Sequence, residues 1–135
     1  MSRLGALAAC LLAAAALGAS VPVTTPARTV LGHADLSAPG EMEVIASVTE
    51  LQRGASLPRH LHHGIETGYV LEGSLVQFPG QAPVLLATGT AILNLRDVAH
   101  AGFTVIGPQP LKLYTVHVVD KGKPLYDWVD SGSGR

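Results

Sequence analysis

The sequence predicts an all-β fold, a single domain of short strands arranged as a sandwich or barrel. From residue 41 onward it consists of short aliphatic and β-branched runs, which Gly, Pro and Asp separate at fairly regular intervals. Beyond the N-terminal segment no window shows a 3.6-residue apolar period, so little helix is expected. A length of 135 residues suffices for one domain with a core and is too short for two.

Residues 1–20 are predicted to be a secretory signal peptide. Arg3 precedes an almost wholly apolar run over residues 4–19, and small residues follow at its end, where cleavage is expected after Ser20 or, alternatively, after Ala27. The run is short for a membrane span, which needs about 20 residues. The mature chain is therefore expected to be periplasmic or secreted and not membrane-bound, with an uncleaved anchor as the alternative.

Cys10, the only cysteine, lies inside this segment, and residues 7–10 resemble an early lipobox of bacterial lipoproteins. If the segment is removed beyond Cys10, the mature chain has neither a disulfide nor a thiolate metal ligand.

The remaining elements follow in order along the chain. Residues 21–40 carry three prolines and are interpreted as a linker leading into a short edge element at residues 29–31. Strands are then expected over residues 42–51, 56–63, 68–71, 74–78, 84–87, 91–94, 101–106 and 111–119. Turn signals such as Pro79-Gly80 and Arg96-Asp97 separate them. The barrel is thus assigned to residues 41–128, and the polar tail over residues 129–135 is expected to be flexible.

The charge pattern excludes two classes of partner. The formal net charge of the full chain is −1, and loss of Arg3 leaves eight basic against ten acidic residues, a net charge of −2. No cluster of Lys and Arg is present, so neither nucleic acid nor an anionic membrane surface is an expected partner.

The segment over residues 54–73 carries the candidate site. His60 and His62 are two residues apart, so on a β-strand both side chains leave the same face. Gly64 permits a turn that returns the Glu66 carboxylate to that side. With His100 from downstream, this set of imidazoles and a carboxylate suits a first-row divalent metal.

The same segment resembles the first motif of the cupin superfamily, because Gly54, His60, His62, Glu66 and Gly73 meet each of its five fixed positions. The second motif is matched only in part. Gly89 and His100 fit its spacing, whereas Leu95, Asp97 and Thr104 stand where Pro, Gly and Asn are usual.

The resemblance covers roughly residues 41–119 and implies a small, secreted, single-domain cupin with a β-barrel of jelly-roll type. It implies that His60, His62, Glu66 and His100 hold one divalent ion of Fe, Mn, Ni, Cu or Zn. It also implies a homodimer formed by strand exchange or sheet packing, and the apolar edge over residues 111–119 is compatible with that.

Four further residues near the motifs are assigned roles. His117 is interpreted as a packed core histidine, with a role beside the metal as the alternative. His63 is expected to face outward, with a place at the cavity entrance as the alternative. Tyr69 is a candidate for lining the pocket. Trp128 is expected to cover one end of the barrel, with stacking against a ligand as the alternative.

The function predicted from the family resemblance is that of a metal-dependent, oxygenase-type enzyme acting on a small organic molecule. Two alternatives remain open: a non-catalytic module that binds a small molecule or the metal, and an isomerase or lyase that uses the metal as a Lewis acid.

Overall fold

The computed structural model describes residues 25–36 and 41–129, and these residues form eleven β-strands and no helix. The strands are β1 (Ala27–Leu36), β2 (Met42–Leu51), β3 (Ser56–Leu57), β4 (His60–Leu61), β5 (Gly64–Glu72), β6 (Ser74–Gln77), β7 (Val84–Leu86), β8 (Ala91–Asn94), β9 (Phe103–Val105), β10 (Leu111–Asp120) and β11 (Asp127–Trp128). Across these two ranges, no helix is long and apolar enough to cross a bilayer. The predicted signal peptide and most of the tail lie outside the described residues.

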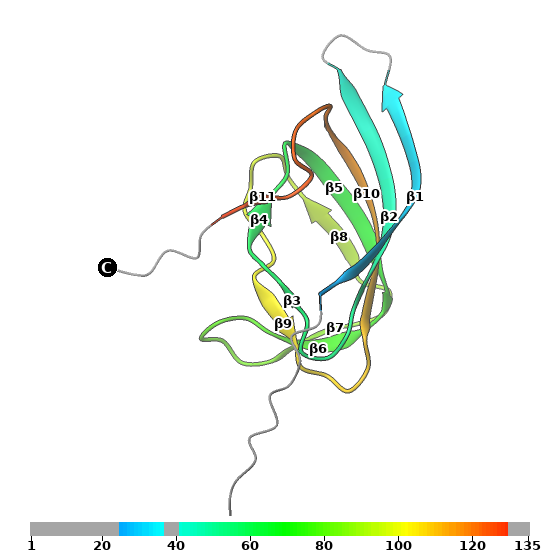
Figure 1. Ribbon diagram of the computed structural model, residues 1–135. Helices are drawn as coiled ribbons and strands as arrows, with labels where there is room; N and C mark the ends of the chain where they lie inside the picture. Colours follow the sequence, from blue (N-terminus) through cyan, green and yellow to red (C-terminus); the bar gives the residue numbers. More distant parts are fainter. Residues whose placement is uncertain (1–24, 37–40, 130–135) are drawn as a thin grey trace, which may run out of the picture.

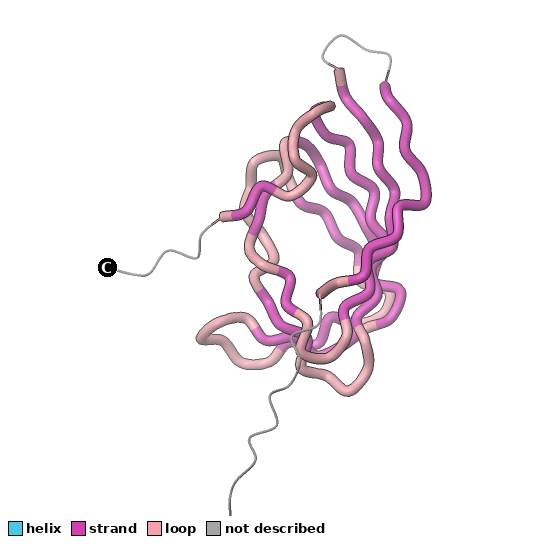
Figure 2. The backbone as a smooth tube through the Cα atoms, in the orientation of Figure 1, coloured by secondary structure: helices cyan, strands magenta, loops and turns pink. Residues whose placement is uncertain are grey.

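Two antiparallel sheets and a short ribbon enclose the interior, as Figure 1 shows. The larger sheet has the order β1-β2-β10-β5-β8, and the smaller has the order β3-β9-β6-β7. The two-stranded ribbon β11-β4 lies across from the larger sheet, and loops join the short strands on that side (Figure 2). The all-β fold predicted from the sequence is confirmed and is consistent with a jelly roll.

The interior is divided into an apolar part and a polar part that the same strands supply. Along β10, alternate side chains are buried, as expected for a strand with one face toward the core. The apolar part is a cluster that includes Leu51, Val70, Val76 and Leu111. Further along β10 the buried side chains become Thr115 and His117, so polar groups fill the other part of the barrel.

The N-terminal edge of the sheet is longer than the sequence indicated. Instead of a short element at residues 29–31, β1 runs over ten residues and pairs with β2 along its length. A register shift between Val30 and Gly32 interrupts the ladder, which a bulge allows without ending the strand.

The suggested dimer edge at residues 111–119 is wrong, because β10 pairs with β2 on one side and β5 on the other. A strand in the middle of a sheet has no unpaired backbone groups to offer a second chain.

Residues 56–63 form two short strands instead of one, since Pro58 lies between β3 and β4. The predicted role of Gly64 as a turn former is also wrong: Gly64 is buried and begins β5. A Cβ atom at this position would clash with the carbonyl oxygen of Val118, so glycine lets β5 approach β10 closely. This close pairing brings the part of β5 that carries Glu66 beside His117.

Candidate metal centre

The backbone fixes two of the predicted residues side by side. The N–H of His60 donates to the carbonyl of His100 at 3.1 Å, and the N–H of His100 donates back at 2.8 Å. The turn before His100 forms where the sequence predicted it, with Asp97 at a φ of 58°. The N–H of Asp97 donates to the carbonyl of His62 at 3.0 Å, which ties this turn to the His60–His62 segment.

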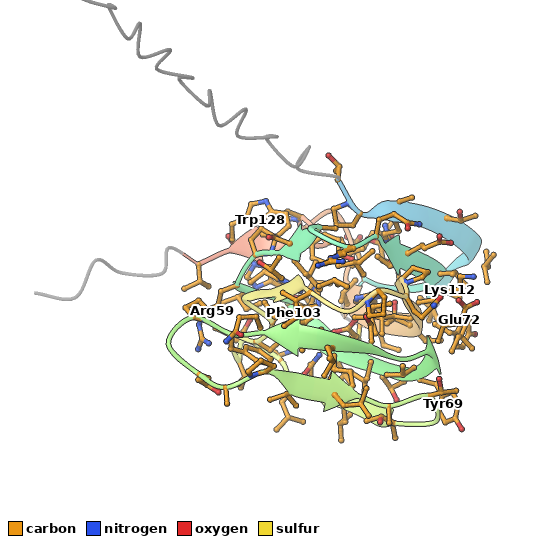
Figure 3. All side chains as sticks on the ribbon, turned by 90° about the horizontal axis from the view of Figure 1, so that it is seen from below. Arg59, Tyr69, Glu72, Phe103, Lys112 and Trp128 are labelled. Carbon is orange, nitrogen blue, oxygen red and sulfur yellow. The ribbon has the colours of Figure 1, made fainter. Side chains whose placement is uncertain are left out.

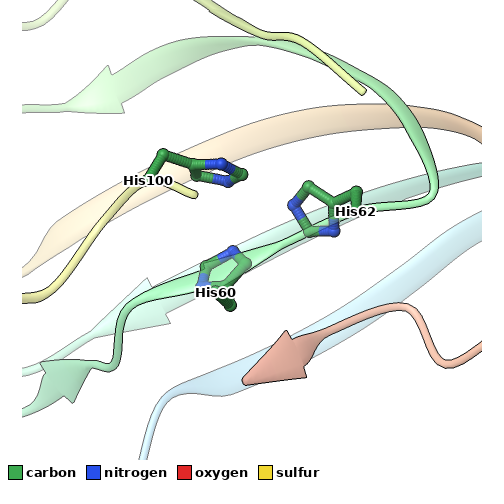
Figure 4. Close-up of side chains that lie close together, drawn as sticks. All are labelled: His60, His62 and His100. Atoms are coloured by element: carbon green, nitrogen blue, oxygen red, sulfur yellow. The ribbon is translucent and has the colours of Figure 1, made fainter. Parts of the chain in front are cut away.

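The three histidines of the two motifs converge on one region of the interior, as Figure 4 shows. The ring centroid of His60 lies 4.8 Å from that of His62 and 4.5 Å from that of His100. Each ring offers a nitrogen within 4.8 Å of the others. A second group with the same spacing consists of His62, Glu66 and His117, so His62 is common to both.

Glu66 lies at the centre of the cluster. Its Oε2 atom is 3.3 Å from Nε2 of His62 and 3.2 Å from Nε2 of His100. Its Oε1 atom is 3.3 Å from Nε2 of His117, which faces it in the β5–β10 register. The side-chain amide of Asn94 on β8 donates to Oε2 at 2.6 Å and so holds the carboxylate in place. One carboxylate thus touches three imidazoles from three parts of the chain.

Backbone carbonyls set the tautomers of the three motif histidines. Nδ1 of His60 contacts the carbonyl of Pro58 at 2.8 Å, and Nδ1 of His100 contacts that of Val98 at 3.0 Å. Nδ1 of His62 contacts the carbonyl of Leu125. Because a carbonyl only accepts, each Nδ1 must carry the proton, and in the neutral ring Nε2 then keeps its lone pair for a metal.

The electrostatics favour the metal-binding forms of Glu66 and His60. Burial alone would raise the pKa of Glu66, but the imidazoles of His100, His117 and His62 together hold it well below the ordinary value. The pKa of His60 is lowered to about 4, mainly by burial and with smaller contributions from His100 and His62, against the opposing effects of the Pro58 carbonyl and Glu66. Near neutral pH Glu66 is therefore a carboxylate and His60 a neutral imidazole, the states that bind metals.

The pKa of His100 moves the other way. Burial lowers it, but the Glu66 carboxylate and the Val98 carbonyl outweigh burial and raise it. A proton on His100 therefore competes with a metal ion for the same lone pair.

Unpartnered nitrogens support a fit between this cluster and a metal ion. Nε2 of His62, Nε2 of His100 and both ring nitrogens of His117 are shielded from solvent and have no aligned hydrogen-bond partner. Buried polar atoms are normally satisfied, and leaving one unpaired costs roughly 1–3 kcal/mol. A divalent ion accepts such lone pairs, and a mixed nitrogen and oxygen set suits a first-row transition metal. The residues present thus fit a metal.

The cluster opens into a chamber of about 190 Å³ inside the barrel. Leu57, Phe78, Ile92 and Phe103 contribute apolar walls, while His60, Glu66, Asn94 and His100 supply the polar groups. Residues 121–129, called here the C-terminal strap, pair with β4 through β11 and contribute Tyr126 to the chamber lining. The strap orients His62 through the Leu125 carbonyl, and Tyr126 packs edge-on against His60 with ring centroids 4.7 Å apart.

Two sequence predictions about nearby residues have different outcomes. His63 faces away from the cluster, as predicted, and its ring contacts Asp97 at 3.0 Å and Asp127 at 3.2 Å. The proposal that Tyr69 lines the pocket is wrong: it is 48% exposed and lies at the periphery in Figure 3, in that view far from Trp128. Tyr69 is three residues from Glu66, and odd spacing on a strand turns a side chain to the opposite face.

The structure adds residues that the motifs did not assign to the site. His117 is a member of the cluster and not merely a packed core residue; its position directly across from Glu66 is the signal that sequence alone lacked. Asn94 is paired with Glu66 in the β5–β8 ladder. Trp128 lies beside the cluster, with its ring centroid 5.6 Å from that of His60, and it stacks on Tyr126.

Comparison with known proteins identifies the family. The model of the cupin domain matches residues 47–117, which is more than half of the chain. No curated protein matches the sequence.

Among solved structures, a double-stranded β-helix domain protein from Klebsiella pneumoniae is similar at a TM-score of 0.58 and 18% identity, covering 82% of this chain and 90% of that one. The polyketide cyclase RemF from Streptomyces resistomycificus is similar at a TM-score of 0.52 and 22% identity, covering 73% and 79%. The DMSP lyase DddQ from Ruegeria pomeroyi is similar at 0.51 and 18%, covering 68% of this chain but only 45% of the lyase. These likenesses establish the fold, and with the matched cupin domain they lead to one conclusion: the chain belongs to the cupin superfamily.

Proposed function

We propose that this protein is a metal-dependent cupin that carries out an oxygenase-type reaction on a small organic molecule. The observation that supports it most strongly is the convergence of three imidazoles on the Glu66 carboxylate, with His60 beside them and several inward nitrogens left unpartnered. The ligand set predicted from the motifs was His60, His62, Glu66 and His100, and His117 offers a fifth donor. Iron(II), manganese(II), nickel(II), copper(II) and zinc(II) all suit such a set.

The bound ion would supply Lewis-acid or redox activation of the substrate. The chain contributes the surroundings for that chemistry. Asn94 holds Glu66, backbone carbonyls orient the histidines, and the apolar walls that include Phe78 and Phe103 keep bulk water from the cluster.

The first test is the metal content of the mature protein, exported and purified without a His-tag, beside a His60→Ala/His62→Ala double variant. Near-stoichiometric metal in the wild type and its loss in the double variant are expected, as read by mass spectrometry. His63→Ala is the matched control, because it removes the adjacent imidazole that faces away from the cluster and should leave the metal in place. If neither protein takes up metal, even after anaerobic reconstitution, the proposal is wrong and the non-catalytic binding module becomes the better hypothesis.

Oxygen dependence separates the oxygenase from an isomerase or lyase. Structures similar to this chain include a polyketide cyclase and a DMSP lyase, so the shared fold does not by itself select a reaction class. Turnover that stops when oxygen is removed supports the oxygenase. Turnover that continues without oxygen supports Lewis-acid chemistry at the same cluster.

We further propose that the mature protein is exported and forms a homodimer. The apolar segment over residues 4–19 supports export, and the mass of the protein recovered from periplasm or medium tests cleavage after Ser20 or Ala27. Outward apolar side chains on β5 and β8, such as Ile65 and Leu93, offer a surface for sheet packing. Sedimentation velocity at micromolar concentration should give a dimer, and a monomer would contradict it.

A further inference from the structure

Arg28 is a charged residue that the metal cluster does not use. It lies on β1 opposite the buried Thr49, and its Nε atom donates to Oγ of Ser47 at 3.2 Å. Its Nη2 atom is shielded from solvent and has no hydrogen-bond partner. A guanidinium donor without an acceptor is uncommon in a protein interior, because each such group forfeits the hydrogen bonds it made in water. The arrangement is therefore incomplete in a way that an anion would complete.

Arg28 lines a hollow of about 440 Å³ beside the metal chamber. The hollow is bounded by Tyr126, Trp128, Pro58 and Leu57, and none of the residues that line it is acidic. The guanidinium carbon lies 5.8 Å from the centroid of the Tyr126 ring. Tyr126 and Trp128 are stacked, with centroids 5.3 Å apart and an angle of 9° between the ring planes. One positive charge thus lies in the same hollow as two aromatic rings, and the other side chains that line it are uncharged.

The hollow and the chamber are neighbours with a shared wall. Thr49, Leu57 and Tyr126 line both of them. The chamber alone, at about 190 Å³, is smaller than typical small-molecule pockets, which run from roughly 300 to 1,000 Å³. The hollow falls within that range. A substrate whose reacting end entered the chamber would therefore need to leave most of its body in the hollow.

We propose that this hollow binds the body of an organic monoanion, with its carboxylate on Arg28 and its apolar part against Tyr126 and Trp128. Arginine pairs with a carboxylate through two parallel hydrogen bonds, and the aromatic rings supply area for a flat or aliphatic body. Because Nη2 is covered, entry of the carboxylate requires a local side-chain shift. The inference names the substrate class of the proposed metal site and rests on that function for its chemistry, but anion binding can be measured separately.

The only tryptophan of the chain is Trp128, so intrinsic fluorescence reports directly on this hollow. The full-length protein is titrated with 3-phenylpropionate and with its neutral isostere 3-phenylpropanamide. The carboxylate should bind about tenfold more tightly than the amide, as expected for a charge-assisted pair. In Arg28→Gln this preference should fall to near one, and Arg28→Lys should retain part of it.

Arg59→Gln is the matched control, because Arg59 lines an adjoining groove that shares Trp128 with the hollow but does not itself line the hollow. Figure 3 shows both residues on the same side of the molecule. The control should keep the preference for the carboxylate. Three results would overturn the anion site: no preference in the wild type, a preference that survives Arg28→Gln, or a preference lost in Arg59→Gln instead.

Metal content and thermal unfolding are measured for every variant, so that a misfolded variant is recognised. If Arg28→Gln does not fold, the preference for the carboxylate is judged from Arg28→Lys. Failure of the anion site appears as unchanged metal content with no role for Arg28 in binding. If the metal centre is wrong, the wild type contains no metal but still binds the carboxylate through Arg28. That result would support the anion site and contradict only the metal centre.

Discussion

The two parts of the barrel interior use the same strands but are filled with opposite kinds of side chain. In one part, Leu111 of β10 packs in a cluster with Val70 of β5. In the other part, His117 of β10 lies beside Glu66 of β5, and both ring nitrogens of His117 lack an aligned partner. The apolar part gains free energy from burial, whereas the polar part leaves hydrogen-bonding capacity unused. The comparison teaches that the stabilising core and the candidate metal site are separated along single strands.

The largest expected effect is in the apolar part. Leu111 is fully buried, and Leu111→Ala should lower the free energy of unfolding of the metal-free protein by about 2–5 kcal/mol, since a core truncation loses transfer energy and leaves a cavity. Urea unfolding measures this. The affinity for metal should change little, because Leu111 does not line the chamber. A loss below about 1 kcal/mol would mean that this part is not the main source of stability.

The next effect concerns metal affinity. Asn94→Ala removes the amide that donates to Glu66, and it should weaken metal binding about 10–100-fold while leaving the stoichiometry unchanged. Competition with a fluorescent chelator measures the affinity. Thr67→Ala is the control, because Thr67 lies on the outward face of the same strand pair and bonds the carbonyl of Ile92. Equal losses in both variants would point to a general loosening of β5 against β8.

A smaller effect is expected in the pH dependence of stability. His60 has a pKa of about 4 in the folded protein and an ordinary value of 6.5 in the unfolded chain. Between these two values the unfolded chain binds a proton at His60 and the folded protein does not. The stability linked to His60 is therefore present above pH 6.5 and is lost as the pH falls toward 4. In metal-free His60→Asn, urea unfolding should give a shallower decline over this range.

His100 acts in the opposite direction, because its raised pKa adds stability at low pH that disappears as the pH rises through the folded value. His100 is present in both the wild type and His60→Asn, so its contribution cancels when the two proteins are compared. Leu111→Val is the control, since it removes no titrating group and should shift the whole curve without changing its slope. A slope in His60→Asn equal to that of the wild type would contradict the low pKa.

The sequence predicted those parts of the fold and site that depend on local spacing. The His60–His62 pair, Glu66 and the turn at Asp97 could be found because period two and turn chemistry act over a few residues. His117 and Asn94 could not be assigned to the site, because their places beside Glu66 depend on which strands pair and in what register. The error over Tyr69 was avoidable, since its odd offset from Glu66 already puts it on the outer face.

Arg28 was missed for a further reason. It lies in the stretch interpreted as a linker, and only its pairing with β2 brings it to the interior. Likewise, nothing in the local sequence connects Leu125 with His62, although the Leu125 carbonyl orients that ring. Long-range partners of this kind are set by topology, which a pattern of apolar and polar residues does not encode.

The smallest expected effect is also the sharpest test of the comparison. His117 and Leu111 lie on one strand and are both fully buried, but His117→Leu should leave the metal-free protein within about 1 kcal/mol of the wild type, or stabilise it. The substitution replaces two unpartnered nitrogens with apolar atoms of similar bulk, which removes the free-energy cost of burying them. It also removes the contact between His117 and Glu66, and this loss offsets part of the gain. Urea unfolding of the two variants side by side measures the difference. If His117→Leu instead cost as much as Leu111→Ala, the polar part would be a satisfied core, and the unpartnered nitrogens would no longer argue for a ligand there.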